Sequence, residues 1–187
     1  MRTFLIVVPA ILALACQRDP GGDVGPTSAA AIMSLEEIPR SQRAEVSQHI
    51  ANTEITVSYS RPVARGRALF GSLVPYDEIW HPGADRATAI AVTRDVHINN
   101  RSLPAGRYSL WTIPRPEIWT VIFSRAADVF HMPYPGDDHD ALRLDVGAEM
   151  GAHMEALMFY FPAVDGKDAI LRLHWGDVMV PLEIRVP

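Results

Sequence analysis

The strongest constraint on the fold is an alternation of apolar and polar residues that recurs along most of the chain. It is clearest in the last segment, VMVPLEIRV (178–186), in which every second residue is Val, Leu or Ile. A period of two is typical of a β-strand that buries one face and exposes the other. Pro181 lies in this segment and has no amide hydrogen, so we expect it at a sheet edge or a bulge.

Other segments show the same alternation, or a short apolar run between turn residues. They are 53–59, 87–93, 95–98, a strand ending at Ile113, 119–124, 155–161 and 169–175. Asn99 and Asn100 predict a hairpin turn, because Asn tolerates positive φ. There is no internal repeat and no long amphipathic helix. The sequence therefore predicts an all-β domain: an antiparallel β-sandwich, or a partly open barrel, of about nine short strands over residues 43–187.

The first sixteen residues, MRTFLIVVPAILALAC, combine a basic start, an apolar run and small residues before Cys16. This pattern predicts a signal peptide over residues 1–15, too short to be a membrane span. Cys16 is the only cysteine, so no internal disulfide can form. The segment resembles the lipobox of bacterial lipoproteins, in which the cysteine is acylated and becomes the new N-terminus. An ordinary signal peptide is the alternative.

The lipobox resemblance implies a membrane anchor at Cys16 and a place in the bacterial cell envelope. Gln17 rather than Asp follows the cysteine, which by the same resemblance implies the outer membrane. Residues 17–32 are rich in Gly, Pro, Ser and Ala, so they have too few apolar side chains to pack and predict a tether. Ser34 and Glu37 have the spacing of a capping box and predict a helical turn within 34–42. We therefore assign 16–42 to a lipidated N-terminus and tether.

Charge and motifs exclude several classes of function. The formal net charge is −5 and no run of Lys and Arg forms a basic stripe, so we expect no nucleic-acid partner. No segment matches a phosphate-binding glycine loop, a zinc cluster or a serine nucleophile elbow, so we expect no cofactor.

Seven histidines raise the question of a metal site. His131 and His139 flank an acidic stretch, but their spacing places no two imidazoles on one helix face or on adjacent strand positions. We interpret that stretch as a solvated acidic loop. His174 shares the polar face of a predicted strand with Arg172, so we expect it on the surface.

The richest segment is YSRPVARGRALFGSLVPYDEIWHPGADRAT (59–88), which holds four arginines, three acids and four aromatic residues. One interpretation is a structural network in which arginines brace the loop and Phe70 and Trp80 plug one end of the sandwich. A second is a site for a small anionic or sugar-like ligand. A third is catalysis by His81 and Asp85 as base and orienting group. The candidate ligand-binding residues are Tyr59, Arg61, Arg67, Trp80, His81 and Asp85.

Several blocks in this segment and beyond it, including YSRP, LVPY, LPAGRYSL and WTVIF, resemble the bacterial domain-of-unknown-function family 2911. The resemblance covers roughly residues 43–187 and implies a secreted or envelope protein without implying an activity. The family generally has Arg at position 81 and Asn at position 85. His81 and Asp85 are thus both departures, which argues against a catalytic pair.

Together these features predict a lipid-anchored cell-envelope β-sandwich that acts as a non-catalytic binding or structural module. The alternative is an envelope hydrolase acting on a glycan or an ester. It would use His81 and Asp85, or a metal near His131 and His139.

Overall fold

The computed structural model describes residues 40–187. The predicted signal peptide, Cys16, residues 17–32 and Ser34 lie outside the described residues. Ser41 and Gln42, the last residues of the predicted tether and turn segment, belong to the first strand. None of the helical segments in the described part is long and apolar enough to cross a membrane.

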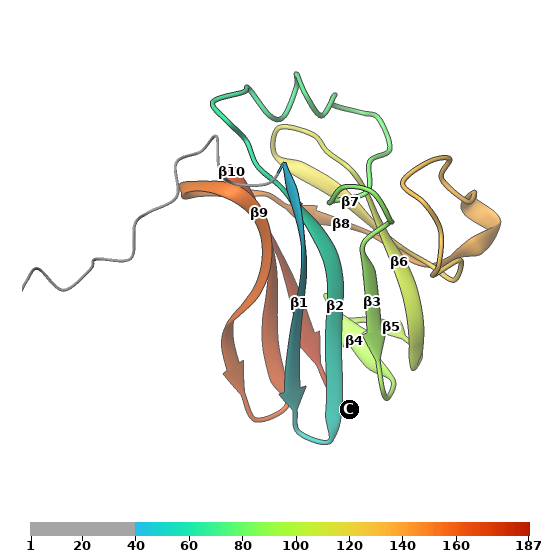
Figure 1. The fold of residues 1–187 in the computed structure, drawn as a ribbon. Helices are drawn as coiled ribbons and strands as arrows, with labels where there is room; N and C mark the ends of the chain where they lie inside the picture. Colours follow the sequence, from blue (N-terminus) through green and yellow to red (C-terminus); the bar gives the residue numbers. More distant parts are fainter. Residues whose placement is uncertain (1–39) are drawn as a thin grey trace, which may run out of the picture. The chain divides into compact units, whose positions relative to one another are not determined.

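The described chain folds into two antiparallel sheets that face each other and are not closed into a barrel (Figure 1). The six-stranded sheet has the order β1-β2-β3-β6-β7-β8, with β1 (Ser41–Ile50), β2 (Thr53–Pro62), β3 (Ala89–Val92), β6 (Gly106–Ile113), β7 (Ile118–Ser124) and β8 (Asp140–Gly147). The four-stranded sheet has the order β5-β4-β10-β9, with β4 (Val96–Ile98), β5 (Arg101–Leu103), β9 (Glu149–Asp165) and β10 (Asp168–Arg185). The predicted all-β sandwich is confirmed.

The alternation in the sequence decides which faces are buried. Ile55, Val57 and Tyr59 on β2 point into the core between the sheets, as predicted, and Thr53 is buried with them. The Asn99–Asn100 turn is also confirmed, since both residues have positive φ and join β4 to β5.

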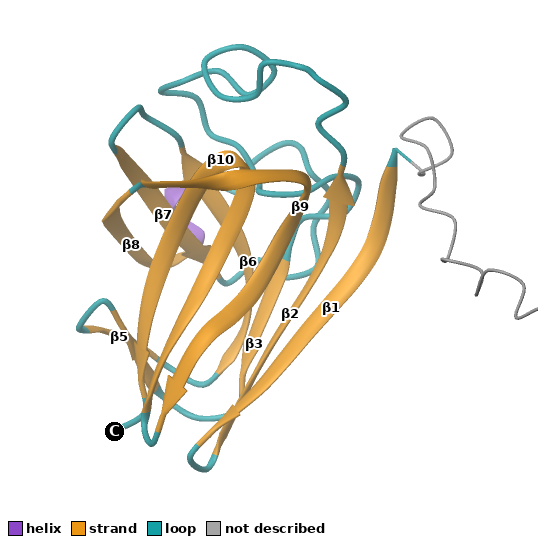
Figure 2. Cartoon of the chain, turned by 90° about the vertical axis from the view of Figure 1, so that its left-hand side faces the viewer, coloured by secondary structure: helices purple, strands orange, loops and turns teal. Residues whose placement is uncertain are grey.

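The last two strands are much longer than the sequence predicted. Segments 169–175 and 178–186 were expected as separate strands, but 168–185 forms the single strand β10, which pairs with the 17-residue β9. Gly176 lies between the two segments with φ +57°, which only glycine adopts readily. Figure 2 shows that the β9–β10 hairpin is bent. Beyond the bend the chain runs back toward the start of β10, where Val186 N donates a hydrogen bond to Lys167 O at 2.9 Å.

Pro181 lies within β10, which is an inner strand of its sheet rather than an edge strand. The registered pairs with β9 end at Met179 and those with β4 begin at Ile184. Pro181 falls between these two stretches, where its missing amide hydrogen interrupts no registered pair.

The expectation that His174 lies on the surface is wrong. Its side chain is only 4% exposed, and Nε2 lies 3.0 Å from the carbonyl oxygen of Ala152. The register of β10 against β9 shifts on either side of His174, and the hairpin bends at Gly176. Strict alternation along the sequence therefore assigned this residue to the wrong environment.

A second, smaller core lies on the outer face of the six-stranded sheet. Ala87, Trp111 and Ile122 form it, and Val129 and Tyr134 from the loop 125–139 pack against it. This loop explains why β6 and β7 are buried on both faces, and it brings residues near 131 close to the loop that joins β2 to β3.

Candidate ligand site at the loop end

The connection between β2 and β3, residues 63–88, closes one end of the sandwich; we call this end the loop end (Figure 1). It is tied to both sheets by its backbone. Ala64 N donates to Glu155 O of β9 at 2.8 Å, while Trp80 and Thr112 of β6 exchange two hydrogen bonds of 2.8 and 2.7 Å. These hydrogen bonds tie the loop to β9 of one sheet and to β6 of the other.

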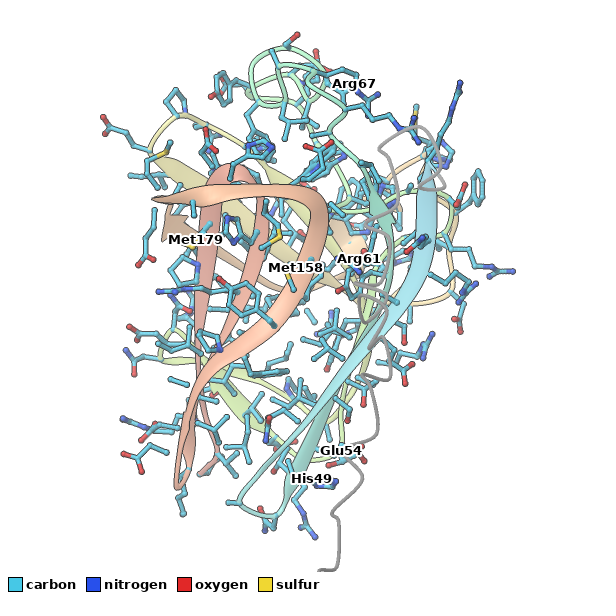
Figure 3. The ribbon with its side chains drawn as sticks, turned by 60° about the vertical axis from the view of Figure 1, so that its left-hand side comes forward. His49, Glu54, Arg61, Arg67, Met158 and Met179 are labelled. Atoms are coloured by element: carbon cyan, nitrogen blue, oxygen red, sulfur yellow. The ribbon has the colours of Figure 1, made fainter. Side chains whose placement is uncertain are left out.

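Three of the candidate ligand-binding residues have partners inside the protein. Arg61 donates from Nε to Leu157 O at 3.1 Å, which joins β2 to β9. Arg67 donates from Nε to Ala64 O at 2.8 Å and from Nη2 to Val63 O at 2.6 Å. Both guanidinium groups thus contact backbone carbonyl groups rather than carboxylates; Figure 3 labels the two side chains. Tyr59 is buried, and its hydroxyl oxygen accepts a hydrogen bond from Phe159 N at 3.1 Å.

Trp80 belongs to a group of aromatic rings that fills the loop end between the sheets; we call Phe70, Trp80, Trp119 and Trp175 the aromatic plug. Trp80 stacks on Trp175 with ring centroids 6.0 Å apart and an interplanar angle of 16°. Phe70 meets Trp119 edge-on at 4.8 Å. The four rings come from the loop and from strands of both sheets, so the plug joins the two layers as the bracing interpretation expected.

His81 and Asp85 lie with Trp80 around a hollow of about 330 Å³ on the outer side of the loop. The hollow is also lined by Ile79, Gly83, Ala84, His131 and Met132. The rings of His81 and His131 lie roughly parallel, with centroids 5.9 Å apart. The backbone N and the Nδ1 atom of His131 both lie 3.1 Å from Asp85 O, so the two loops are joined at this point.

The imidazole of His81 is buried against Trp111, with centroids 5.9 Å apart, and is 6% exposed. The pKa of His81 is lowered from 6.5 to about 4, mainly by burial and secondarily by His131, while the Ala84 backbone and Asp85 oppose the shift. His81 is therefore neutral at physiological pH. Its Nε2 atom is buried and has no hydrogen-bond partner.

Gly83 allows the chain to turn closely around this nitrogen. A Cβ atom at position 83 would lie 2.8 Å from Thr88 Oγ1 and 3.3 Å from Ser60 O. It would also lie 3.5 Å from His81 Nε2. Thr88 itself is buried and donates to Pro82 O at 2.7 Å. Glycine at this position thus keeps the backbone close to β2 and to the imidazole.

Comparison with models of known protein families identifies the family of the chain. The model of the family described as "Protein of unknown function (DUF2911)" matches residues 41–184. The chain belongs to this family. The resemblance found in the sequence is therefore confirmed. No curated protein and no solved structure matches the chain.

The hydrolase alternative required either a hydrogen-bonded His81–Asp85 pair or a metal site, and the described residues of this DUF2911 domain contain neither arrangement. Within residues 40–187 no hydrogen bond joins His81 to Asp85, whose side chain is exposed. The same residues contain no cluster of three or more His, Cys, Asp or Glu side chains able to hold a metal ion. His139 lies in a short 3₁₀ turn, Asp137–His139, whereas His131 faces His81.

A second hollow, of about 280 Å³, lies toward the other end of this DUF2911 domain, between β4, β9 and β10. It is lined partly by charged residues, among which Arg185 and Asp168 already pair at 2.6 Å. None of the candidate site residues lines it. The described residues that line it include no buried polar side-chain atom left without a partner, unlike His81 in the first hollow.

Sequence reasoning missed the part of the first hollow that comes from the loop 125–139. His131 was considered only as a metal ligand together with His139, and Met132 and Ile79 were not considered. Asp85 and His131 are 46 residues apart and meet because the second loop packs on the outer core. The sequence predicted only the part of the hollow that comes from the loop 63–88, through Trp80, His81 and Asp85, which lie close together in the chain.

Proposed function

We propose that this DUF2911 protein is a lipid-anchored module of the bacterial cell envelope that binds a small hydroxylated, sugar-like ligand without catalysis. The ligand site is the hollow beside Trp80, His81, Asp85 and His131. The observation that carries the proposal is the buried Nε2 of His81, which has no partner and belongs to a side chain that lines the hollow. Such an atom gains free energy when a ligand or a water supplies a hydrogen bond.

The chemistry of the walls favours a neutral polar ligand over an anion. No arginine lines the hollow, and Arg61 and Arg67 already donate to backbone carbonyl groups. Asp85 adds a negative charge at the rim. Ile79, Trp80 and Met132 offer apolar surface, which suits the faces of a sugar ring while the imidazole nitrogens meet its hydroxyl groups.

Titration with defined probes tests the ligand site. The side-chain NMR signals of His81, His131 and Trp80 are followed during addition of glucose, N-acetylglucosamine and, as the anionic comparison, glucuronate. We expect one of the neutral probes to shift these signals with saturation, and glucuronate to bind more weakly. The control is Ala84→Phe, which fills the hollow and should abolish the shifts. Saturable shifts that persist in Ala84→Phe would contradict the proposal.

The anchor is tested separately. The lone Cys16 at a lipobox-like site supports acylation there. We expect the wild-type protein to sediment with membranes and its N-terminal peptide to carry acyl mass, and we expect Cys16→Ser to release the protein. A wild-type protein that is soluble after fractionation and lacks acyl mass would refute the anchor without touching the ligand site.

A further inference from the structure

Most of the large exposed apolar side chains among residues 40–187 lie at the loop end or on the neighbouring loop 125–139. We call Leu73, Tyr76, Ile79, Ile118 and Met150 the loop-end patch; all five are exposed, Ile118 by 49% and Met150 by 75%. Asp77 N donates to Pro114 O and Ala148 N donates to Glu117 O, so the three loops that carry these residues or directly precede them are joined to one another. Phe130 and Met132 are exposed on the neighbouring loop 125–139. Val164 is the remaining large exposed hydrophobic among residues 40–187, and it lies next to the β9–β10 turn at the other end.

The interior does not require these side chains to be apolar. The aromatic plug already fills the end of the sandwich between the two sheets. Exposed apolar residues that gather at one end of a domain are typical of surfaces that meet a partner or a membrane.

We infer that the loop-end patch rests on a lipid bilayer. This rests on the proposed anchor at Cys16. The described chain begins at the same end, since Val63 N donates to Arg40 O at 3.3 Å. Arg40 is 24 residues after Cys16 (40 minus 16), a stretch that spans no more than about 85 Å. An acyl anchor at Cys16 therefore keeps the patch within reach of the membrane and leads the chain into the end that carries it.

The charges of the patch loops indicate that docking is apolar rather than electrostatic. Residues 63–80, 114–117 and 148–150 together contain three arginines and four acids. A surface this close to balance gains little from anionic lipids, whereas shallow insertion of Leu, Ile, Met and Tyr side chains needs only a lipid interface. Docking is accordingly expected on zwitterionic phosphatidylcholine and is expected to withstand salt.

The test compares two labelled positions in the full protein on phosphatidylcholine vesicles. An environment-sensitive NBD fluorophore is attached to Ile118→Cys in the patch, or to Val164→Cys, which is an exposed apolar residue at the other end. We expect a several-fold rise in fluorescence and quenching by nitroxide-labelled lipid at position 118 only, unchanged in 0.5 M NaCl. Leu73→Asp in the Ile118→Cys protein should reduce the rise at least twofold without changing the acyl mass.

The possible failures are separable. Equal signals at the two positions, or none at position 118 in a protein whose acyl mass is confirmed, would overturn docking while leaving the anchor intact. A missing acyl mass on the N-terminal peptide refutes the anchor. In such an unacylated protein Cys16 is labelled as well, so a rise supports the patch only where it is larger for Ile118→Cys than for Val164→Cys, which carries the same label at Cys16.

Discussion

Trp80 and His81 are neighbours in the sequence and both line the hollow, but their rings pack in different cores. Trp80 points between the sheets, where it stacks on Trp175, whereas His81 packs against Trp111 in the outer core. The tryptophan ring completes the packing of the plug, while the imidazole keeps one buried nitrogen without a partner. Of the two neighbouring side chains that line the hollow, Trp80 thus also stabilises the fold, whereas His81 keeps a polar atom available for binding.

The largest effect is expected at the packed side. Trp80→Ala should lower the free energy of unfolding by about 3–5 kcal/mol, because it leaves a cavity among three other aromatic rings. Chemical denaturation measures the change, and Trp80→Phe should recover part of the loss. If Trp80→Ala unfolds at the denaturant concentration of the parent, the plug does not hold the loop end.

His81 is expected to make stability depend on acid pH. Its pKa in the folded protein is about 4, below the ordinary 6.5, so between these values the unfolded chain takes up a proton that the folded chain does not. The free energy of unfolding should therefore fall as the pH drops from 6.5 to 4, by up to about 3 kcal/mol, and this contribution should level off below that range.

The measurement is the difference between wild type and His81→Gln in denaturation curves across this pH range, because carboxylate titration is common to both proteins. A constant difference from pH 7 to pH 4 would show that the imidazole is not held neutral. A bound sugar-like ligand that hydrogen-bonds to neutral His81 should enlarge the difference.

The sequence predicted the sheets better than it predicted their bends. Alternation on β2 and in 178–186 reflects a pleat with one buried side, which is a local property of the chain. The burial of His174 depends on how the β9–β10 hairpin bends at Gly176. The sequence alone does not distinguish a glycine that ends a strand from a glycine at which a strand bends. This is why one strand was predicted as two and a buried histidine was placed on the surface.

The candidate site was predictable only in part for a similar reason. Loop composition pointed to Trp80, His81 and Asp85, but it could not distinguish them from Arg61 and Arg67, whose guanidinium groups turn inward to backbone carbonyls. A long loop must satisfy its own backbone groups, so the same residue types serve bracing and binding. The loop 125–139 completes the hollow through packing on Trp111 and Ile122, which no sequence spacing encodes.

A smaller effect is expected from the bracing arginine. Arg67 donates two hydrogen bonds to carbonyl groups at the start of the loop and remains largely in contact with solvent. Arg67→Ala should lower the free energy of unfolding by about 1–2 kcal/mol, less than a buried carboxylate left without its partner would cost. Arg67→Lys cannot reproduce the two-point contact and should recover less than half of the loss. A loss as large as that of Trp80→Ala would mean that Arg67 organises the whole loop end.

The smallest effect should come from a second histidine, with the opposite dependence on pH. His153 on β9 lies 3.0 Å from Glu155 through Nε2 and 3.0 Å from Asp177 through Nδ1, and these carboxylates raise its pKa above 6.5. The pair with Glu155 also bears on the loop, because Glu155 accepts a hydrogen bond from Arg65 N. A raised pKa contributes stability that is fully present below pH 6.5 and is lost as the pH rises through the folded value. Solvent surrounds this histidine, so the contribution should be much smaller than that of His81.

His153→Gln should therefore lose stability at pH 5.5 and match the parent at pH 9, and Asp177→Asn should show part of the same loss. Equal stability of His153→Gln and the parent at pH 5.5 would leave His81 as the histidine through which pH acts on the loop end.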